Sequence, residues 1–111
     1  MMLQQQERFA LPTYALERLS RSGKPETFGS VDDKWRLLVI LLGRQAQARK
    51  TALRDVHTLL DLPQHVAFRL VRGLELGRLI TVGACLHDAF AAELELTEEC
   101  STLVRRVLAR G

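Results

Sequence analysis

The stretch LPQHVAFRLVRGLELGRLI, residues 62–80, carries the pattern on which the fold depends. Pro63 suits the first turn of a helix, because the N–H that proline lacks would have had no partner there. Apolar side chains then recur three or four residues apart, the spacing that places them on one side of a helix. They are Ala67, Leu70, Val71 and Leu74. The stretch predicts an amphipathic helix over about 63–77 with this side packed on a core.

The opposite side of this predicted helix is polar and basic. It carries Gln64, His65, Phe68, Arg69 and Arg72. The arginine fork matches guanine edges and phosphate oxygens, and glutamine pairs with adenine in the major groove. We therefore predict that this side contacts DNA, with solvated surface residues as the alternative for the polar members. For Phe68 two interpretations stay open, contact with a thymine methyl or a protein-binding patch.

Two further elements flank this helix. Before it, Thr51 is placed to cap a helix whose apolar stripe ends at Asp61, and a short turn then leads to Pro63. Two helices joined by such a turn, the second with a polar outer side, form a helix-turn-helix. After Gly77, alternation in ITVGACL and FAAELELT predicts two strands joined by a turn at 87–89. A hairpin at this position completes a winged helix.

The remaining segments predict three more helices around this unit. Thr13 is placed to cap a short helix, GKPETFGS has the composition of a linker, a buried helix starts near Lys34, and Thr97 caps the last helix. The fold class is therefore mainly α with a small β-hairpin, a winged helix-turn-helix. We assign 1–30 to an N-terminal helix and linker with a candidate role in dimerisation. Residues 31–111 form the winged helix-turn-helix domain with its C-terminal helix.

From Leu53 to Leu108 this order of elements resembles the winged-helix regulators of the MarR type. The matching residues are Arg69, Leu74-Glu75, Leu79-Ile80, Asp88 and Leu96-Thr97-Glu98-Glu99, and the spacing between them agrees without gaps. The resemblance covers about half of the chain. It implies a dimeric transcription regulator whose first and last helices form the dimer.

The sequence also departs from that family pattern. Arg78 occupies the place of a family glycine, with Gly77 before it, and Cys100 replaces another glycine. Ala89-Phe90 stands where the family has wing arginines, and residues 79–104 contain no lysine or arginine. Because phosphate contacts are made by basic groups, the predicted wing cannot hold DNA by charge.

The positive charge of the chain gathers in its middle. The net charge is +3, but residues 44–78 hold seven basic side chains against three acidic ones. Arg44, Arg49 and Lys50 lie between two predicted helices, where we expect them to contact phosphates beside the major groove. A solvated loop is the alternative.

Dimerisation would use apolar residues of the first and last helices. The candidates are Tyr14, Leu16, Leu19, Leu103, Val104, Val107 and Leu108. A single winged-helix core would bury only part of this set. The alternative is that both helices pack within one subunit.

Several classes of protein find no support in the sequence. No Ser/His/Asp order, phosphate loop or HExxH motif occurs, so we expect no enzyme and no cofactor. The three histidines are separated and predict no metal site. Without an export signal or an apolar run long enough to cross a membrane, we expect a cytoplasmic protein. Cys85 and Cys100 are expected to be buried small residues.

Two functions fit these features. The first is a sequence-specific DNA-binding transcription regulator, a homodimer that inserts the helix at about 63–77 into the major groove of double-stranded DNA. The second is a winged-helix protein–protein interaction module that does not bind DNA. The apolar wing without basic residues and the position of Phe68 favour the second.

Overall fold

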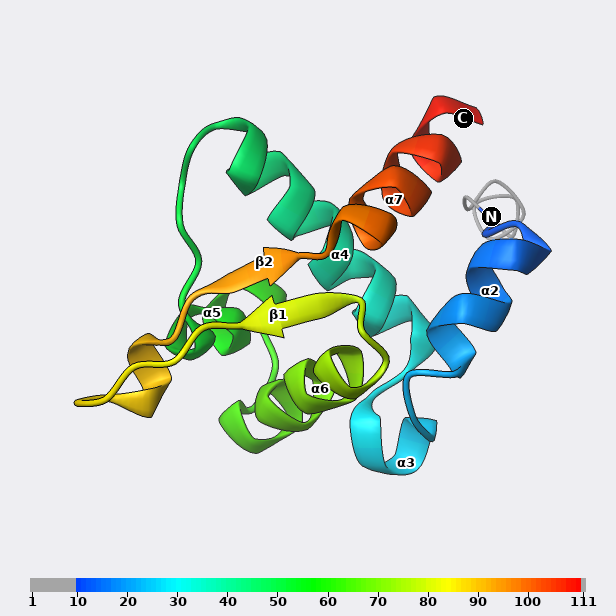
Figure 1. Ribbon diagram of the computed structural model, residues 1–111. Helices are drawn as coiled ribbons and strands as arrows, with labels where there is room; N and C mark the ends of the chain where they lie inside the picture. The colour runs from blue at the N-terminus through cyan, green and yellow to red at the C-terminus, as the bar shows by residue number, and fades with distance from the viewer. Residues whose placement is uncertain (1–9, 111) are drawn as a thin grey trace.

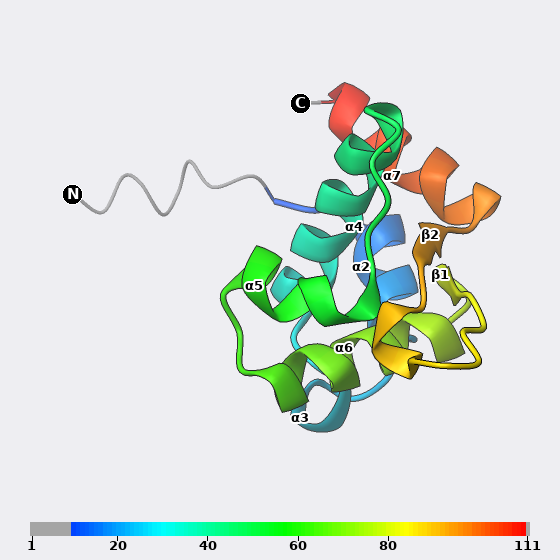
Figure 2. The same ribbon diagram turned by 90° about the vertical axis from the view of Figure 1, so that its left-hand side faces the viewer.

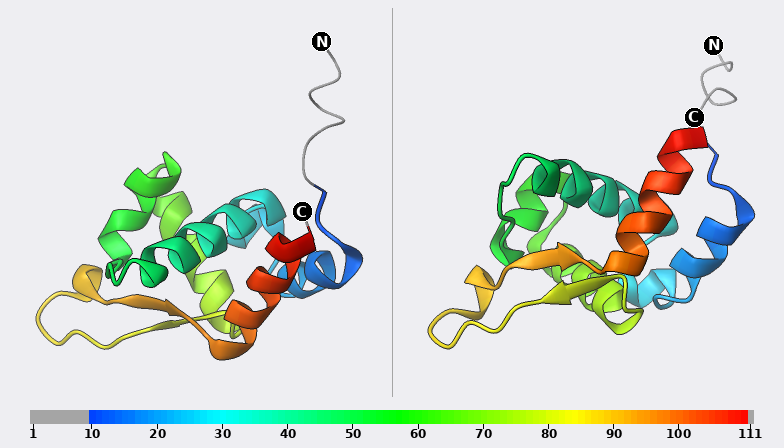
Figure 3. Two further views of the ribbon diagram at one scale, coloured as in Figure 1. Left: turned by 90° about the horizontal axis from the view of Figure 1, so that it is seen from above. Right: turned by 45° about the horizontal axis from the view of Figure 1, so that its top comes forward.

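A computed structural model of the chain describes residues 10–110 and shows a helical protein with one β-hairpin (Figure 1). Its elements are, in chain order, α2 (Thr13–Ser20), α3 (Pro25–Phe28), α4 (Val31–Ala46), the 3₁₀ turn η1 (Leu53–Asp55), α5 (Val56–Leu60), α6 (Gln64–Leu76), β1 (Ile80–Val82), the 3₁₀ turn η2 (Ala89–Ala91), β2 (Leu94–Leu96) and α7 (Glu98–Arg110). This order confirms the predicted winged helix-turn-helix fold. The tip of the hairpin lies at one end of the molecule, and α2 and α7 lie at the other (Figures 1 and 3).

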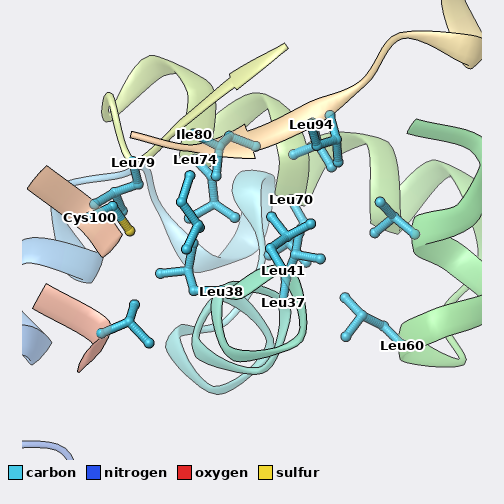
Figure 4. Packing of buried hydrophobic residues seen from close by; sticks show 14 of the residues in the cluster. Leu37, Leu38, Leu41, Leu60, Leu70, Leu74, Leu79, Ile80, Leu94 and Cys100 are labelled. Carbon is cyan, nitrogen blue, oxygen red and sulfur yellow. The ribbon is translucent and has the colours of Figure 1, made fainter. Parts of the chain in front are cut away.

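Helix α4 carries the centre of the core. Leu37, Leu38 and Leu41 have no exposed surface, and Figure 4 shows them between labelled residues of α6, the hairpin and α7. Leu60 of α5 and Cys100 of α7 belong to the same cluster. Burying one such leucine is worth about 1.5–3 kcal/mol. A single core therefore holds the helix-turn-helix, the hairpin and the end helices together.

Helix α6 buries the side that the sequence predicts. The carbonyl of Pro63 accepts hydrogen bonds from the N–H groups of Val66 and Ala67, both at 3.0 Å, and so starts the helix. The predicted inner residues Ala67, Leu70, Val71 and Leu74 are all buried. Helices α3 and α5 both pack against α6 (Figure 2). The helix is therefore supported along its length.

The chain leaves α6 through a left-handed residue, Arg78. Its φ of 61° belongs to the region where glycine is the least strained residue, which explains why the resembling family has glycine at this position. Gly77 is needed for another reason, since a Cβ atom built on it would lie 2.7 Å from the Cβ of Ser22. The glycine of this chain thus serves close packing, and an arginine adopts the left-handed turn.

The hairpin of residues 80–96, which forms the wing, contains a small antiparallel sheet. Its two strands pair over three residues each, with Ile80 opposite Leu96. An isolated bridge between Ala52 and Glu93 continues the pairing toward the segment before α5. The wing is therefore attached to the helix-turn-helix at its base.

The strands are shorter than the alternation predicts. Beyond Val82 the predicted inner residue Leu86 is 95% exposed, because no other element lies over it. Asp88 accepts a hydrogen bond from the N–H of Phe90 at 2.9 Å and begins η2. The turn η2 therefore replaces the start of the predicted second strand, and the prediction of strands over ITVGACL and FAAELELT is wrong at their outer ends.

Of the three predicted threonine caps, the one at Thr97 is correct and those at Thr51 and Thr13 are wrong. The hydroxyl of Thr97 accepts the N–H of Cys100 at 3.1 Å and caps α7 as predicted. Thr51 caps no helix, because the next residue, Ala52, is extended and holds the cap position of the 3₁₀ turn η1, which leads into α5. The carboxylate of Asp55 accepts the N–H of Ala52 at 2.9 Å and closes that turn instead.

The N-terminal part also differs from its prediction. Helix α2 begins at Thr13, but Pro12 holds the cap position and no side chain caps the helix. The segment GKPETFGS is not an open linker, since it contains α3. Helix α4 begins at Val31, ahead of the predicted start, because the hydroxyl of Ser30 accepts the N–H of Asp33 at 3.1 Å.

Residues 10–110 contain neither a membrane-spanning helix nor a cluster of metal ligands. None of the helices in this range has the length and apolar composition needed to cross a membrane. Within the same range no group of three or more His, Cys, Asp or Glu side chains is placed to hold a metal ion.

Candidate nucleic-acid interface

The outward side of α6 presents the predicted polar residues. Gln64, His65, Arg69 and Arg72 are all exposed. Successive residues of an α-helix are rotated by about 100° around its axis. His65, Arg69 and Arg72 therefore lie on one arc of the helix surface. The buried residues on the opposite arc fix the helix, and these side chains therefore project together into solvent.

The two arginines of this arc are differently engaged. Arg72 lies 3.4 Å from the Oε1 atom of Glu75, one turn along the helix, and its side chain is 63% exposed. An exposed pair of this kind contributes about 0–1 kcal/mol, so Arg72 exchanges partners at little cost. Within residues 10–110 the side chain of Arg69 makes no ion pair or hydrogen bond. Both guanidinium groups are thus available to a ligand.

Phe68 is held by the wing. Its ring stacks on that of Phe90 in η2, with the centroids 5.3 Å apart and the planes inclined by 20°. Phe68 is half-buried in consequence. The stack joins α6 to the wing, so the predicted contact of Phe68 with a thymine methyl would require the two rings to separate.

Ion pairs also brace the wing against the helix-turn-helix. Arg54 of η1 lies 3.2 Å from a carboxylate oxygen of Asp88, and Lys50 lies 3.5 Å from one of Glu93. Both pairs are exposed. They pair two of the three carboxylates between residues 80 and 96, Asp88 and Glu93, and leave Glu95 exposed.

Of the three predicted flanking residues, Arg44 has a structural role. Its Nε donates to the hydroxyl of Thr51 at 2.7 Å, and its Nη2 donates to the carbonyl of Lys50 at 2.8 Å. Arg44 thereby fixes the loop after α4, and its predicted contact with a phosphate stays a prediction. Arg49 and Lys50 are exposed, and they share an open hollow of about 320 Å³ with Glu93.

The predicted dimer residues divide into two groups. Leu19, Val104 and Val107 are fully buried within one chain, which corrects their assignment and agrees with the alternative of packing inside one subunit. Tyr14 and Leu103 are half-buried. Leu16 and Leu108 remain 40% and 44% exposed. Only this second group offers apolar surface to another molecule.

Polar contacts tie α2 to α7 beside this group. The guanidinium of Arg106 lies over the ring of Tyr14, 4.5 Å from its centroid. Arg18 lies 3.3 Å from a carboxylate oxygen of Glu99. The two helices therefore form one unit at the end of the molecule away from the wing.

The two cysteines differ in burial. Cys100 is fully buried, and burial raises the pKa of its thiol to about 12. Its thiol is consequently protonated and unreactive at neutral pH. Cys85, in the wing, is only half-buried, so the expectation of two buried cysteines holds for Cys100 alone.

Two apolar residues of the exposed surface were missed from the sequence. Leu76 is 57% exposed at the end of α6. It follows Arg72 by four residues and Arg69 by seven, so the helical period would have placed it on the same arc. Leu86 was assigned to the inner side of a strand, and no local signal marks the end of that strand.

The comparisons with known proteins concern the fold. No protein-family model matches the chain, and no curated protein does. Among solved structures, the transcriptional regulator homologue protein from Pyrococcus horikoshii OT3 matches with a TM-score of 0.58 and 22% sequence identity, over 84% of this chain and 88% of that one. The two chains share a fold. Membership of the MarR type stays a prediction.

Proposed function

We propose that the protein is a transcription regulator that binds double-stranded DNA sequence-specifically, with α6 in the major groove. The observation that carries the proposal is the exposure of Arg69 and Arg72 on one arc of a helix anchored from behind by Leu70 and Leu74. The helix-turn-helix places such a helix in the groove. The described name of the similar Pyrococcus horikoshii protein, a transcriptional regulator homologue, agrees with this role.

The side chains of α6 divide the contacts between them. Arg69 and Arg72 reach guanine edges or phosphates, and one bidentate base contact is worth about 1–3 kcal/mol of discrimination. Gln64 at the start of the helix is placed to pair with adenine, and His65 lies beside it. Arg49 and Lys50 contact flanking phosphates. Lys50 must leave Glu93 to do so, which is a small cost for an exposed pair.

The wing contributes little to affinity in this proposal. Each phosphate contact adds about −0.9 to the slope of log K against log salt concentration. Without a lysine or arginine between residues 79 and 104, the wing adds nothing to that slope. The salt dependence therefore comes from α6 and from the loop that follows α4.

We propose further that the protein acts as a homodimer. Leu16, Leu103 and Leu108 would form its contact together with Tyr14, because these residues keep apolar surface exposed. Two copies of α6 then read a near-palindromic site, since a two-fold dimer repeats its contacts on both half-sites. Light scattering at micromolar concentration tests this point, and a monomer there contradicts it.

Selection of bound fragments from random DNA, followed by fluorescence anisotropy, tests the main proposal. The native chain is expected to prefer one site over unrelated DNA. The variant with Arg69→Ala and Arg72→Ala is expected to lose that preference. The control variant, Arg105→Ala with Arg110→Ala, removes the same charge from exposed positions of α7. It is expected to keep the preference for the selected site. Equal loss in both double variants, or no preference in the native chain, contradicts the proposal.

A second candidate function is protein docking through the wing. It is favoured by Leu86, whose side chain is 95% exposed at a tip that lacks basic groups. A complex with a protein partner that survives nuclease, persists in Arg69→Ala with Arg72→Ala, and is lost in Leu86→Ser would support this function. A Leu86→Ser chain that keeps the complex would exclude the wing tip as its site.

A further inference from the structure

One side of α6 faces neither solvent nor the wing. Gly73 lies on this side, and Gly77, four residues later, is the C-cap residue of the helix. A Cβ atom built on Gly73 would lie 2.6 Å from the Cβ of Phe28 and 2.6 Å from the carbonyl oxygen of Ser22. One built on Gly77 would lie 2.7 Å from the Cβ of Ser22. No side chain fits between the helix and residues 22–28. The backbone of α6 therefore lies directly against residues 22–28. This segment, the α2–α3 connection, comprises the loop after α2 and helix α3 itself.

A buried lysine fixes the α2–α3 connection to α4. The Lys34 side chain has no exposed surface, and its Nζ donates to the carbonyl of Gly23 at 2.9 Å and to that of Leu19 at 3.3 Å. The hydroxyl of Ser22 donates to the same Leu19 carbonyl at 2.6 Å. Burial lowers the pKa of Lys34, but the carbonyl oxygens at the end of α2 are favourable partners for a cation.

A displacement of this connection would break the hydrogen bonds of the Lys34 ammonium and the Ser22 hydroxyl or expose these groups to solvent. A buried ammonium that loses its acceptors carries a large desolvation penalty. The connection is therefore a rigid support for α6. The wing is the weaker support on the other flank, because Phe90, which stacks on Phe68, is itself 48% exposed.

We propose that the α2–α3 connection sets the orientation of α6, so that Gly73 and Gly77 are positioning residues for the base contacts of Arg69 and Arg72. This inference rests on the proposed DNA-binding function. A methyl group at position 73 has to move from 2.6 Å to an ordinary carbon contact of about 3.5–4.0 Å, which displaces the helix by about 1 Å. Base hydrogen bonds weaken steeply at such a displacement, whereas phosphate attraction tolerates it.

The test compares the same substitution, glycine to alanine, at three positions. Gly73→Ala and Gly77→Ala add a methyl against the connection, and Gly43→Ala adds it to α4, where a Cβ meets nothing within 4 Å. Anisotropy gives the affinity for the selected site and for unrelated DNA, at a temperature where circular dichroism shows each chain folded. Gly73→Ala and Gly77→Ala are expected to lower the ratio of these affinities by about tenfold or more, the discrimination given by one bidentate base contact. Gly43→Ala is expected to leave it unchanged.

A rescue experiment separates positioning from loss of structure. Ser22→Gly removes the Cβ atom that a methyl at position 77 would meet at 2.7 Å and leaves the Cα atom at 3.0 Å. It also removes the hydroxyl that donates to Leu19, so Ser22→Gly alone is the reference. The chain with Gly77→Ala and Ser22→Gly is expected to regain part of the ratio lost by Gly77→Ala alone. A double variant no better than Gly77→Ala overturns the proposal, as does a native ratio in the folded single variants.

Amide hydrogen exchange supplies a readout that needs no DNA. Amides of α6 are expected to exchange faster in Gly77→Ala than in Gly43→Ala, because the support of the helix is disturbed only in the first. Equal exchange in both variants overturns the proposal. A native chain without DNA binding refutes the proposed function, whereas native binding with unchanged ratios in the variants refutes the positioning alone.

Discussion

Replacing Arg78 by glycine is expected to stabilise the protein. Arg78 is exposed, with a φ of 61°, and a left-handed conformation costs a residue with a Cβ atom roughly 1–2 kcal/mol. Glycine avoids this strain but makes the unfolded chain more flexible, which removes about 0.4–1 kcal/mol of the gain. The backbone hydrogen bonds of residue 78, to Glu75 and from the hydroxyl of Thr97, remain. The expected net gain is about 0.5–1 kcal/mol.

Thermal unfolding followed by circular dichroism measures this effect. A gain of that size raises the midpoint by about 2–8 °C in a domain of this length. Arg78→Ala is the matched control, because it removes the charge and keeps the Cβ atom, and its midpoint is expected to stay near the native one. Ala48 is also exposed, with a φ of 59°, so Ala48→Gly is expected to stabilise as well. If Arg78→Gly melts no higher than Arg78→Ala, the turn stores no strain and the explanation of the family glycine is refuted.

Three further predictions concern the interior, the wing and the dimer. Burial raises the pKa of Cys100 from 9.0 to about 12, so its contribution to stability is complete below pH 9.0 and is lost as pH rises toward 12. In that window the unfolding free energy of the native chain should fall relative to that of Cys100→Ala, by up to about 1.4 kcal/mol per pH unit. Equal pH dependence of the unfolding free energy in the two chains would exclude the raised pKa. Phe90→Ala should lower stability by at least about 0.5–1.5 kcal/mol through the lost stack, whereas Leu86→Ala in the same wing should not, and equal melting of the two would show that the stack contributes nothing. Leu108→Glu should turn the proposed dimer into a monomer in light scattering, and an unchanged mass would remove Leu108 from the contact.

The helix-turn-helix could be predicted because its signals are local. Pro63 and the three- and four-residue spacing of the inner residues define α6 without reference to any other segment. The ends of the hairpin could not be predicted in this way. Alternation from Ile80 to Leu86 is the pattern of a half-buried strand, but nothing in that stretch tells that Leu86 lacks a neighbour to cover it.

The candidate site follows the same division. The exposure of Arg69 and Arg72 follows from the helical period, and the structure agrees with it. The roles of Phe68 and Arg44 depend on partners elsewhere in the chain, a ring in the wing and a loop after α4. The spacing of residues in the sequence does not give these distances. A side chain held by a partner within the chain therefore could not be distinguished from one that is free to bind a ligand.

Salt-dependent DNA binding tests the central claim most directly. The affinity of the native chain and of Arg69→Ala with Arg72→Ala is measured by anisotropy at several salt concentrations, both chains being folded. If the exposed arc of α6 contacts DNA, the double variant binds more weakly, and its slope is shallower by about 0.9 for each phosphate contact removed. Equal affinity and equal slope in the two chains would contradict the account.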